Sequence, residues 1–373
     1  MSLAKRIVAI VCLGIATCSN GETVRDPSFK PHLEHLAVWV KDLDKTAAFL
    51  NDALGWRRHP LQFGVDEDSK VFGGMKLAFV DANGIWLELV EPTTPGPGMD
   101  FLNEKGKGAL VELDFFVDDF DKAAATVRAK GIQPMGMDGK PMVNGGLLRE
   151  WAIKDGKRIR GDERLLYMPM DVSRGTSVEL GWEYPSGVVL LRDATWNEKQ
   201  RTPRSAPHVD HTTVIAADMK KSLVFYNDVL QLPKIDQTSG IARDWMGVGA
   251  NAQAWVAGNP DGMWINLVQP DSSPAGKSTL TDKKFGDGMI MELGVEVADI
   301  RKFTESMRAK GIVMTTNGST ALPTGETSVF VATSGDRYNY FPLSKSEGMR
   351  ILVFQRGSTS KSLFAARDAS TKR

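Results

Sequence analysis

The sequence repeats itself, and this repeat constrains the fold more than any other feature. The segment 32–56 reappears at 208–232 without a gap, at an offset of 176 residues, and nine of the twenty-five positions are identical. Both copies contain His-x-x-His, so they hold four of the five histidines of the 373-residue chain. A second match joins 84–92 to 262–270. Self-similarity of this kind indicates a tandem duplication of one folding unit.

Each half carries a finer repeat that is marked by aspartates. In every copy an apolar, strand-like segment precedes an Asp-x-x-Lys motif, and a helical pattern follows it. Aspartate is a favoured helix N-cap because its carboxylate accepts hydrogen bonds from free N–H groups of the first turn. We therefore expect four modules, each a strand, a helix and a set of short strands, whose helices begin after Asp42, Asp119, Asp218 and Asp299.

These modules define the domain organisation. They fill two domains, at about 29–185 and 206–357, with a linker at 186–205 and a polar tail at 358–373. The length agrees with a prior of roughly 150 residues per domain. The 46 basic residues are balanced by 46 acidic ones, so the chain lacks the basic surplus that is typical of nucleic-acid binding.

The N-terminus is typical of an export signal. Two basic residues precede an apolar run at 7–16, which is too short to span a bilayer. Cys18 follows small residues, as in bacterial lipoprotein signals, so we expect a signal peptide at 1–17 and a lipid on Cys18. The protein would then be periplasmic or anchored to a bacterial membrane through this lipid alone. Cleavage by an ordinary signal peptidase is one alternative, because Thr17 is uncommon before such a cysteine, and a buried N-terminal element is another.

Strand alternation places four polar side chains on equivalent faces. Side chains of a strand point alternately to the two sides of a sheet, and the first two modules place one histidine and three glutamates on the side away from the helix. Burying an unpaired carboxylate there costs several kcal/mol, so each must meet water, a cation or a metal. For one glutamate, a solvated face with scattered charges explains the pattern. Repeated at equivalent positions, the pattern favours a shared pocket formed by His35, Glu88, Glu112 and Glu179.

These residues carry a family resemblance. His35 seven residues before Asp42, the segment Phe49-x-x-Asp52-x-Leu54-Gly55 and the later Leu87-Glu88-Leu89 resemble the vicinal oxygen chelate superfamily. That superfamily includes glyoxalase I, extradiol dioxygenases, methylmalonyl-CoA epimerase and bleomycin-resistance proteins. The resemblance covers nearly all of 32–356. It implies an α+β fold, in which four βαβββ modules form two glyoxalase-like domains with curled, cup-shaped mixed sheets.

The resemblance also implies a divalent metal. Superfamily ligands come from the first and last strands of a module, which here gives His35, Glu88, Glu112 and Glu179. One histidine with three carboxylates fits Mn²⁺, Mg²⁺, Ca²⁺, Zn²⁺ or Ni²⁺ better than iron, which usually takes two histidines and one carboxylate. The second domain offers His211, Asn266 and Glu292 but has no acid in its last strand, so we expect the ion in the first domain. His32 and His208 are expected at the strand entrance or rim, and His59 at the surface.

The implied function is a metal-dependent lyase or isomerase of glyoxalase type. Its substrate would be a small apolar carbonyl compound that chelates the ion, while Glu179 or Glu88 moves a proton next to the carbonyl. One alternative is a non-catalytic protein that sequesters a small molecule, as bleomycin-resistance proteins do. Another is a ring-cleaving extradiol dioxygenase, but Glu112 and Glu292 stand where its second histidine would be. The expected partner in every case is a small molecule.

Overall fold

A computed structural model describes most of the chain. The expected signal peptide, Cys18, most of the linker and the tail lie outside the described residues, so the inferences about them stay predictions. No helix within the described part is long and apolar enough to cross a membrane. The described residues are 28–65, 74–106, 108–136, 140–142, 146–183, 201–203, 205–235, 250–258, 263–274, 277, 288–330 and 335–357.

The first domain is a nine-stranded mixed sheet. Its strands pair in the order β2-β4-β3-β7-β8-β9-β6-β1-β5, and β4 also pairs with β5. All strands except the short β2 therefore close into a ring, in line with the expected cup. The elements are β1 (His32–Trp39), α2 (Leu43–Leu54), β2 (Arg57–Arg58), β3 (Gln62–Val65), β4 (Met75–Asp81), β5 (Trp86–Pro92), α3 (Pro97–Lys105), β6 (Ala109–Phe116), α4 (Phe120–Ala129), β7 (Gly146–Lys154), β8 (Lys157–Tyr167) and β9 (Ser177–Glu183).

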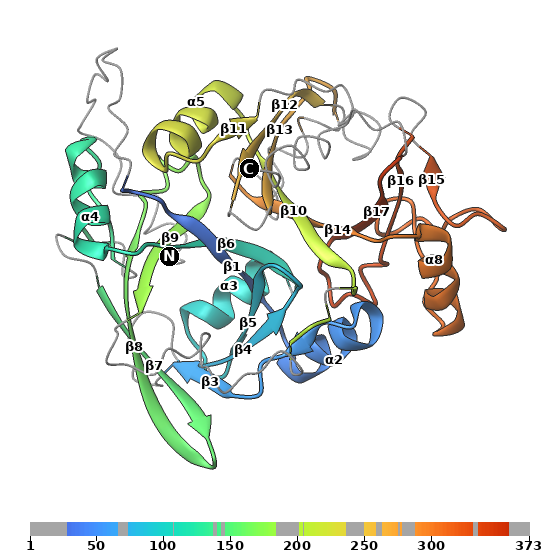
Figure 1. The fold of residues 1–373 in the computed structure, drawn as a ribbon, viewed down its shortest axis with the longest axis horizontal. Coiled ribbons are helices and arrows are strands. Elements are labelled where there is room, and N and C mark those ends of the chain that lie inside the picture. Colours follow the sequence, from blue (N-terminus) through green and yellow to red (C-terminus); the bar gives the residue numbers. More distant parts are fainter. Residues whose placement is uncertain are drawn as a thin grey trace.

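The second domain repeats this plan in an eight-stranded sheet of order β11-β12-β13-β10-β14-β17-β16-β15. In both domains the first strands of the two modules pair antiparallel, β1 with β6 and β10 with β14. The predicted α+β fold of four strand–helix–strands modules is thereby confirmed (Figure 1). The elements are β10 (His208–Ile215), α5 (Met219–Leu223), the π-helix η1 (Val224–Val229), β11 (Lys234–Ile235), β12 (Ala250–Ala257), β13 (Trp264–Pro270), β14 (Ile290–Glu296), α8 (Ile300–Ala309), β15 (Val329–Phe330), β16 (Arg337–Tyr340) and β17 (Ile351–Gln355).

The predicted N-caps are present in all four modules. Asp42 Oδ1 accepts a hydrogen bond from the Lys45 N–H at 2.9 Å, and the other three aspartates make the same contact at 3.0 to 3.1 Å. Helix α2 ends at Gly55, whose φ of 70° lies in the left-handed region that glycine tolerates. Its counterpart Gln231 has a φ of 57°, and there the helix ends as the π-helix η1.

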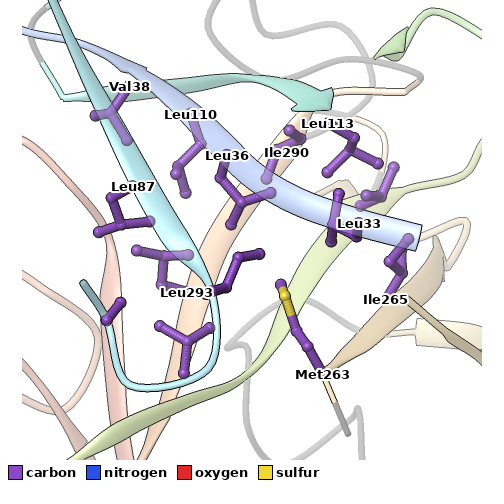
Figure 2. Close-up of a cluster of buried hydrophobic side chains, with 14 of the residues drawn as sticks. Leu33, Leu36, Val38, Leu87, Leu110, Leu113, Met263, Ile265, Ile290 and Leu293 are labelled. Atoms are coloured by element: carbon purple, nitrogen blue, oxygen red, sulfur yellow. The ribbon is translucent and has the colours of Figure 1, made fainter. Parts of the chain in front are cut away.

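The two domains share one apolar core. Side chains from β1, β5 and β6 of the first domain lie beside side chains from β13 and β14 of the second (Figure 2). The apolar face of each sheet is therefore buried against the other domain and the helices, and the opposite face is left for polar residues. The labelled members of this core are at most 4% exposed: Leu33, Leu36, Val38, Leu87, Leu110, Leu113, Met263, Ile265, Ile290 and Leu293.

Reciprocal contacts relate the domains by an approximate twofold symmetry. The Leu33 N–H donates to the Gly258 carbonyl at 2.7 Å, and the Val209 N–H donates to the Ala82 carbonyl at 3.1 Å. Both donors and both acceptors are separated by 176 residues, the offset of the duplication. The two halves therefore pack on each other as two copies of one subunit do in a dimer.

Candidate metal centre

The inner face of the first sheet, which points away from the shared core, has an apolar part and an acidic part. The apolar part, here called the inner apolar cluster, includes two residues of β1 on the same face as His35. Phe79 of this cluster meets His35 edge-on, with ring centroids 5.6 Å apart. The acidic part therefore lies directly beside an aromatic surface. The buried members of the cluster are Ala37, Trp39, Phe63, Val65, Met75, Leu77, Phe79, Val90, Leu102 and Ala152.

His35 lies between two carboxylates. Its Nε2 is 2.9 Å from Asp114 Oδ2 on β6 and 3.6 Å from Glu88 Oε2 on β5. Burial by itself lowers the pKa of His35, but the two carboxylates together outweigh it and hold the pKa well above its usual value. The His35 ring therefore interacts closely with both acids.

Glu112 and Glu179 complete the group. Glu112 faces Ala37 across β6 and β1, and Ala37 also faces Glu88 across β5. Burial, followed by the charges of Asp114 and Glu88, raises the pKa of Glu112 from 4.5 to about 8, against a hydrogen bond with Glu179 that lowers it. The structure thus brings all four sequence-predicted residues of the first domain together on one face.

Two members of the site were not predicted from the sequence. Asp114 lies in register with both His35 and Glu179, and it is buried. The signal was its place two residues after Glu112, on the same face of the strand. Tyr167 of β8 is in register with Glu179 and hydrogen bonds to it; burial, then the charges of Glu112 and Glu179, raises its pKa.

In the second domain, the residues at the same register positions have other partners. Glu292 accepts hydrogen bonds from Thr213 at 3.2 Å and from the Tyr340 hydroxyl at 3.1 Å, and its Oε2 is 3.4 Å from Arg350 Nε. His211 Nδ1 is 3.0 Å from Asp210 Oδ2. Of the two metal ligands predicted for this domain, Glu292 is therefore paired with a cation, and His211 is engaged through Nδ1.

Register also shows what the second domain has replaced. Gly294 takes the place of Asp114, and Leu352 takes the place of Glu179. A Cβ at Gly294 would lie 2.1 Å from the His211 ring, so that ring fills the space of the missing side chain. Asn266 likewise takes the place of Glu88.

A further acidic group lies near the start of β10. One ligand atom from each of His208, Asp210 and Glu296 lies within 4.8 Å of the others, which is close enough for a metal site. Arg356 Nη2, however, is 3.0 Å from Asp210 Oδ1 and 2.7 Å from Glu296 Oε2. A guanidinium therefore already neutralises this group.

The prediction for the fifth histidine, His59, was wrong. His59, expected at the surface, is 1% exposed. Its ring packs 5.1 Å from Phe63 and 5.9 Å from Trp86, and its Nδ1 accepts from the Leu61 N–H at 3.2 Å. The neighbouring Arg57 and Arg58 made a surface loop the natural expectation, but the β2 strand turns the imidazole inward.

Comparisons with known proteins agree with this architecture. The profile described as the Glyoxalase/Bleomycin resistance protein/Dioxygenase superfamily matches residues 34–146, and a second profile with the same description matches 208–330. The chain belongs to this superfamily. Its two domains are tandem copies of the superfamily fold, as the resemblance implied. No curated protein matches the sequence.

Two solved structures have a fold similar to that of this chain over most of its length. A mutant of 4-hydroxymandelate synthase from Streptomyces coelicolor has a TM-score of 0.56 and 14% identity, and the match covers 91% of this chain and 96% of that one. A hypothetical protein from Staphylococcus aureus has a TM-score of 0.52 and 9% identity, with 87% and 98% covered. Identities this low show a common fold and no more.

The first-domain residues fit the divalent ion that the superfamily implies. Three buried polar atoms, His35 Nδ1, Glu112 Oε1 and Asp114 Oδ1, have no hydrogen-bond partner. Among the residues that the structure describes, no lysine or arginine pairs with Glu88, Glu112 or Asp114. Buried carboxylates without a cation are costly, and a bound ion removes that cost. His35, Glu88, Glu112 and Glu179 are the side chains that would hold it.

Proposed function

We propose that the first domain is a metal-dependent acid–base site, which makes the protein a lyase or isomerase that acts on a small carbonyl compound. One observation carries this proposal. Within the described parts of the chain, both acidic groups of the second domain pair with an arginine, Arg350 or Arg356, while no lysine or arginine pairs with Glu88, Glu112 or Asp114 of the first domain. Acidic side chains that have no lysine or arginine beside them are stabilised by a bound metal ion, so the first domain is the better candidate for a metal site.

The side chains have distinct tasks in this proposal. His35, Glu88, Glu112 and Glu179 hold a divalent ion, which when bound polarises two neighbouring oxygens of the substrate. A carboxylate next to the substrate then moves a proton beside the carbonyl, and Glu179 and Glu88 are the candidates. Tyr167 hydrogen bonds to Glu179 and so fixes the orientation of that carboxylate. His35, Asp114 and Glu179 are buried, and limited contact with water strengthens the charge interactions between them.

The oxygenase alternative has support of a different kind. A 4-hydroxymandelate synthase has the same fold over 91% of this chain, so the fold is compatible with an oxygenase as well as with a lyase or isomerase. The side chains oppose it, because the described partners of His35 Nε2 are two carboxylates and His211 pairs with Asp210. An open iron site usually needs two histidines and one carboxylate. A small-molecule binding protein without catalysis is the third candidate.

Metal titration of matched variants tests the proposal. Glu112→Gln and Glu292→Gln make the same change at equivalent register positions of the two domains. We expect the wild type to bind one Mn²⁺, Ni²⁺ or Zn²⁺ per chain by calorimetry, Glu112→Gln to bind at least about tenfold more weakly, and Glu292→Gln to bind as the wild type does. Loss of binding in Glu292→Gln alone would overturn the assignment.

Two assays then separate the reaction classes. Exchange of the proton next to the carbonyl of hydroxyacetone in D₂O, followed by NMR, tests proton transfer by the metal-loaded protein. Oxygen uptake by the Fe²⁺-loaded protein with catechol tests ring cleavage. Exchange without oxygen uptake supports the lyase or isomerase, and oxygen uptake supports the oxygenase. A tightly bound ligand with neither activity supports the binding protein.

A further inference from the structure

The charge of the first-domain site restricts what it can bind. Four carboxylates face one another there, from Glu88, Glu112, Asp114 and Glu179, and their charges exceed the two positive charges of a divalent ion. No described lysine or arginine pairs with the first three, so the site stays negative after an ion binds. Like charges repel strongly at short range in a closed, poorly hydrated interior. A substrate that carries its own carboxylate or phosphate is therefore disfavoured.

We propose that this site selects an uncharged, aromatic or apolar compound with two neighbouring oxygens, and that Asp114 sets the preference. The proposal rests on the metal-dependent function above and adds the substrate class. Asp114 is the carboxylate beyond the four expected metal-binding residues, and it is buried. Its Oδ2 contacts His35, while its Oδ1 has no hydrogen-bond partner. The His35 ring is shared with Glu88, so it compensates the charge of Asp114 only in part.

The inner apolar cluster favours a substrate that is aromatic or apolar. The Phe79 ring lies 5.6 Å from His35 and 6.5 Å from the Trp86 ring, and both contacts are edge-on. Trp86 is partly exposed, so it offers an aromatic surface within reach of a ligand. Aromatic groups bury a large apolar area and favour such edge contacts. The structure thus combines a group of acidic side chains with an adjacent aromatic surface.

The second domain shows which residues make the charge at the equivalent site less negative. Register places Arg350 where the first domain has Ser177, next to the equivalent glutamate. There a guanidinium supplies the positive charge, and Gly294 removes the counterpart of Asp114. The variant Ser177→Arg would bring the same cation into the first domain. It is therefore a natural test of charge selection.

A matched pair of probes measures the preference. 1-Phenyl-1,2-propanedione and benzoylformate share a phenyl ketone and an adjacent oxygen, but only benzoylformate carries a negative charge. We expect the Mn²⁺-loaded protein to bind the dione at least about tenfold more tightly by calorimetry. Asp114→Asn should reduce this ratio about tenfold by strengthening benzoylformate binding. Ser177→Arg should reverse the ratio, while Asp118→Asn, at an exposed position, should leave it unchanged.

The outcomes separate this inference from the proposed function. Equal or tighter binding of benzoylformate by the wild type overturns the inference, and so does an unchanged ratio in both Asp114→Asn and Ser177→Arg. If Asp114→Asn fails to fold, Ser177→Arg decides alone. Titration of Mn²⁺ without either probe reports on the metal site itself. Normal Mn²⁺ binding with the wrong probe preference defeats only the inference, and absent Mn²⁺ binding defeats the proposed function and the inference with it.

Discussion

Arg350 Nε lies 3.4 Å from Glu292 Oε2, and this pair occupies the place where the first domain has Ser177 beside Glu112. The same glutamate position therefore meets a guanidinium in one domain and has a serine as its register partner in the other. Burial raises the pKa of Glu112 to about 8, with the neighbouring carboxylates adding to the rise, which shows how poorly its charge is compensated without a cation. The duplicated fold thus surrounds the equivalent glutamates differently. Glu292 has an arginine beside it, whereas Glu112 lies among other acids.

Removal of the arginine should destabilise the second domain. Glu292 is 1% exposed, so Arg350→Leu leaves a buried carboxylate without its cation. We expect a loss of about 3 kcal/mol in the free energy of unfolding, measured by urea denaturation. The double variant Arg350→Leu/Glu292→Gln removes the charge as well and should recover part of this loss. A single variant as stable as the wild type would show that Arg350 is not the counter-ion.

The metal-free protein should lose stability as the pH rises from about 5 to 8. The pKa of Glu112 is about 8 in the folded chain against 4.5 as its ordinary value, so between these values the folded state holds a proton that the unfolded state has released. His35 acts in the same direction, because its raised pKa gives stability below pH 6.5 that is lost as the pH rises. Thermal unfolding at several pH values measures the slope.

Two variations check the origin of this slope. Glu112→Gln should make it shallower, because the glutamine has no proton to release. Saturating Mn²⁺ should reverse it, because the ion replaces the proton and binds more tightly at higher pH. A metal-free wild type that gains stability from pH 5 to 8 would contradict the raised pKa of Glu112.

Local patterns in the sequence were sufficient for much of the site. The position of each module fixed the face of His35, Glu88, Glu112 and Glu179, because strand alternation and the aspartate caps are local properties. Asp114 lay on the same face but was left out, since the family resemblance supplies one ligand per strand. Its role appears only when β6 pairs with β1 and β9.

Other features depend on contacts that are distant in the sequence. Tyr167 and its counterpart Tyr340 are 173 residues apart, whereas Glu112 and Glu292 are 180 apart, so the repeat does not align the two tyrosines without the strand register. Ring closure depends on the pairing of β3 with β7, about 90 residues away. The inward position of Arg350 likewise follows from tertiary packing, since an arginine at the start of a strand usually faces water.

Export of the protein remains a proposal with a direct test. If 1–17 is a signal peptide and Cys18 is lipidated, protein purified from the membrane fraction should have an intact mass that begins at Cys18 and includes lipid. Cys18→Ser should abolish the lipid mass and leave the first domain's metal binding unchanged. A soluble product that begins at another residue would favour cleavage by an ordinary signal peptidase.

The twofold packing of the domains predicts a pair of sensitive glycines. Gly108 and Gly288 lie just before the equivalent strands β6 and β14 and have φ of 75° and 80°. A Cβ at Gly108 would lie 2.3 Å from Met349 N, and one at Gly288 would lie 2.2 Å from Arg174 O, both in the opposite domain. Alanine at either position adds this clash to the cost of the left-handed conformation. We expect each variant to lose more than about 2 kcal/mol of stability.

Gly131 provides the matched control for this prediction. It has a φ of 76°, yet nothing lies within 4 Å of the position of its Cβ. Gly131→Ala should therefore cost only the conformational strain, about 1 kcal/mol, in the same urea denaturation experiment. The excess loss in Gly108→Ala and Gly288→Ala then measures the contact between the domains. If all three variants lose the same amount, the close approach of the two domains at these glycines does not contribute to stability.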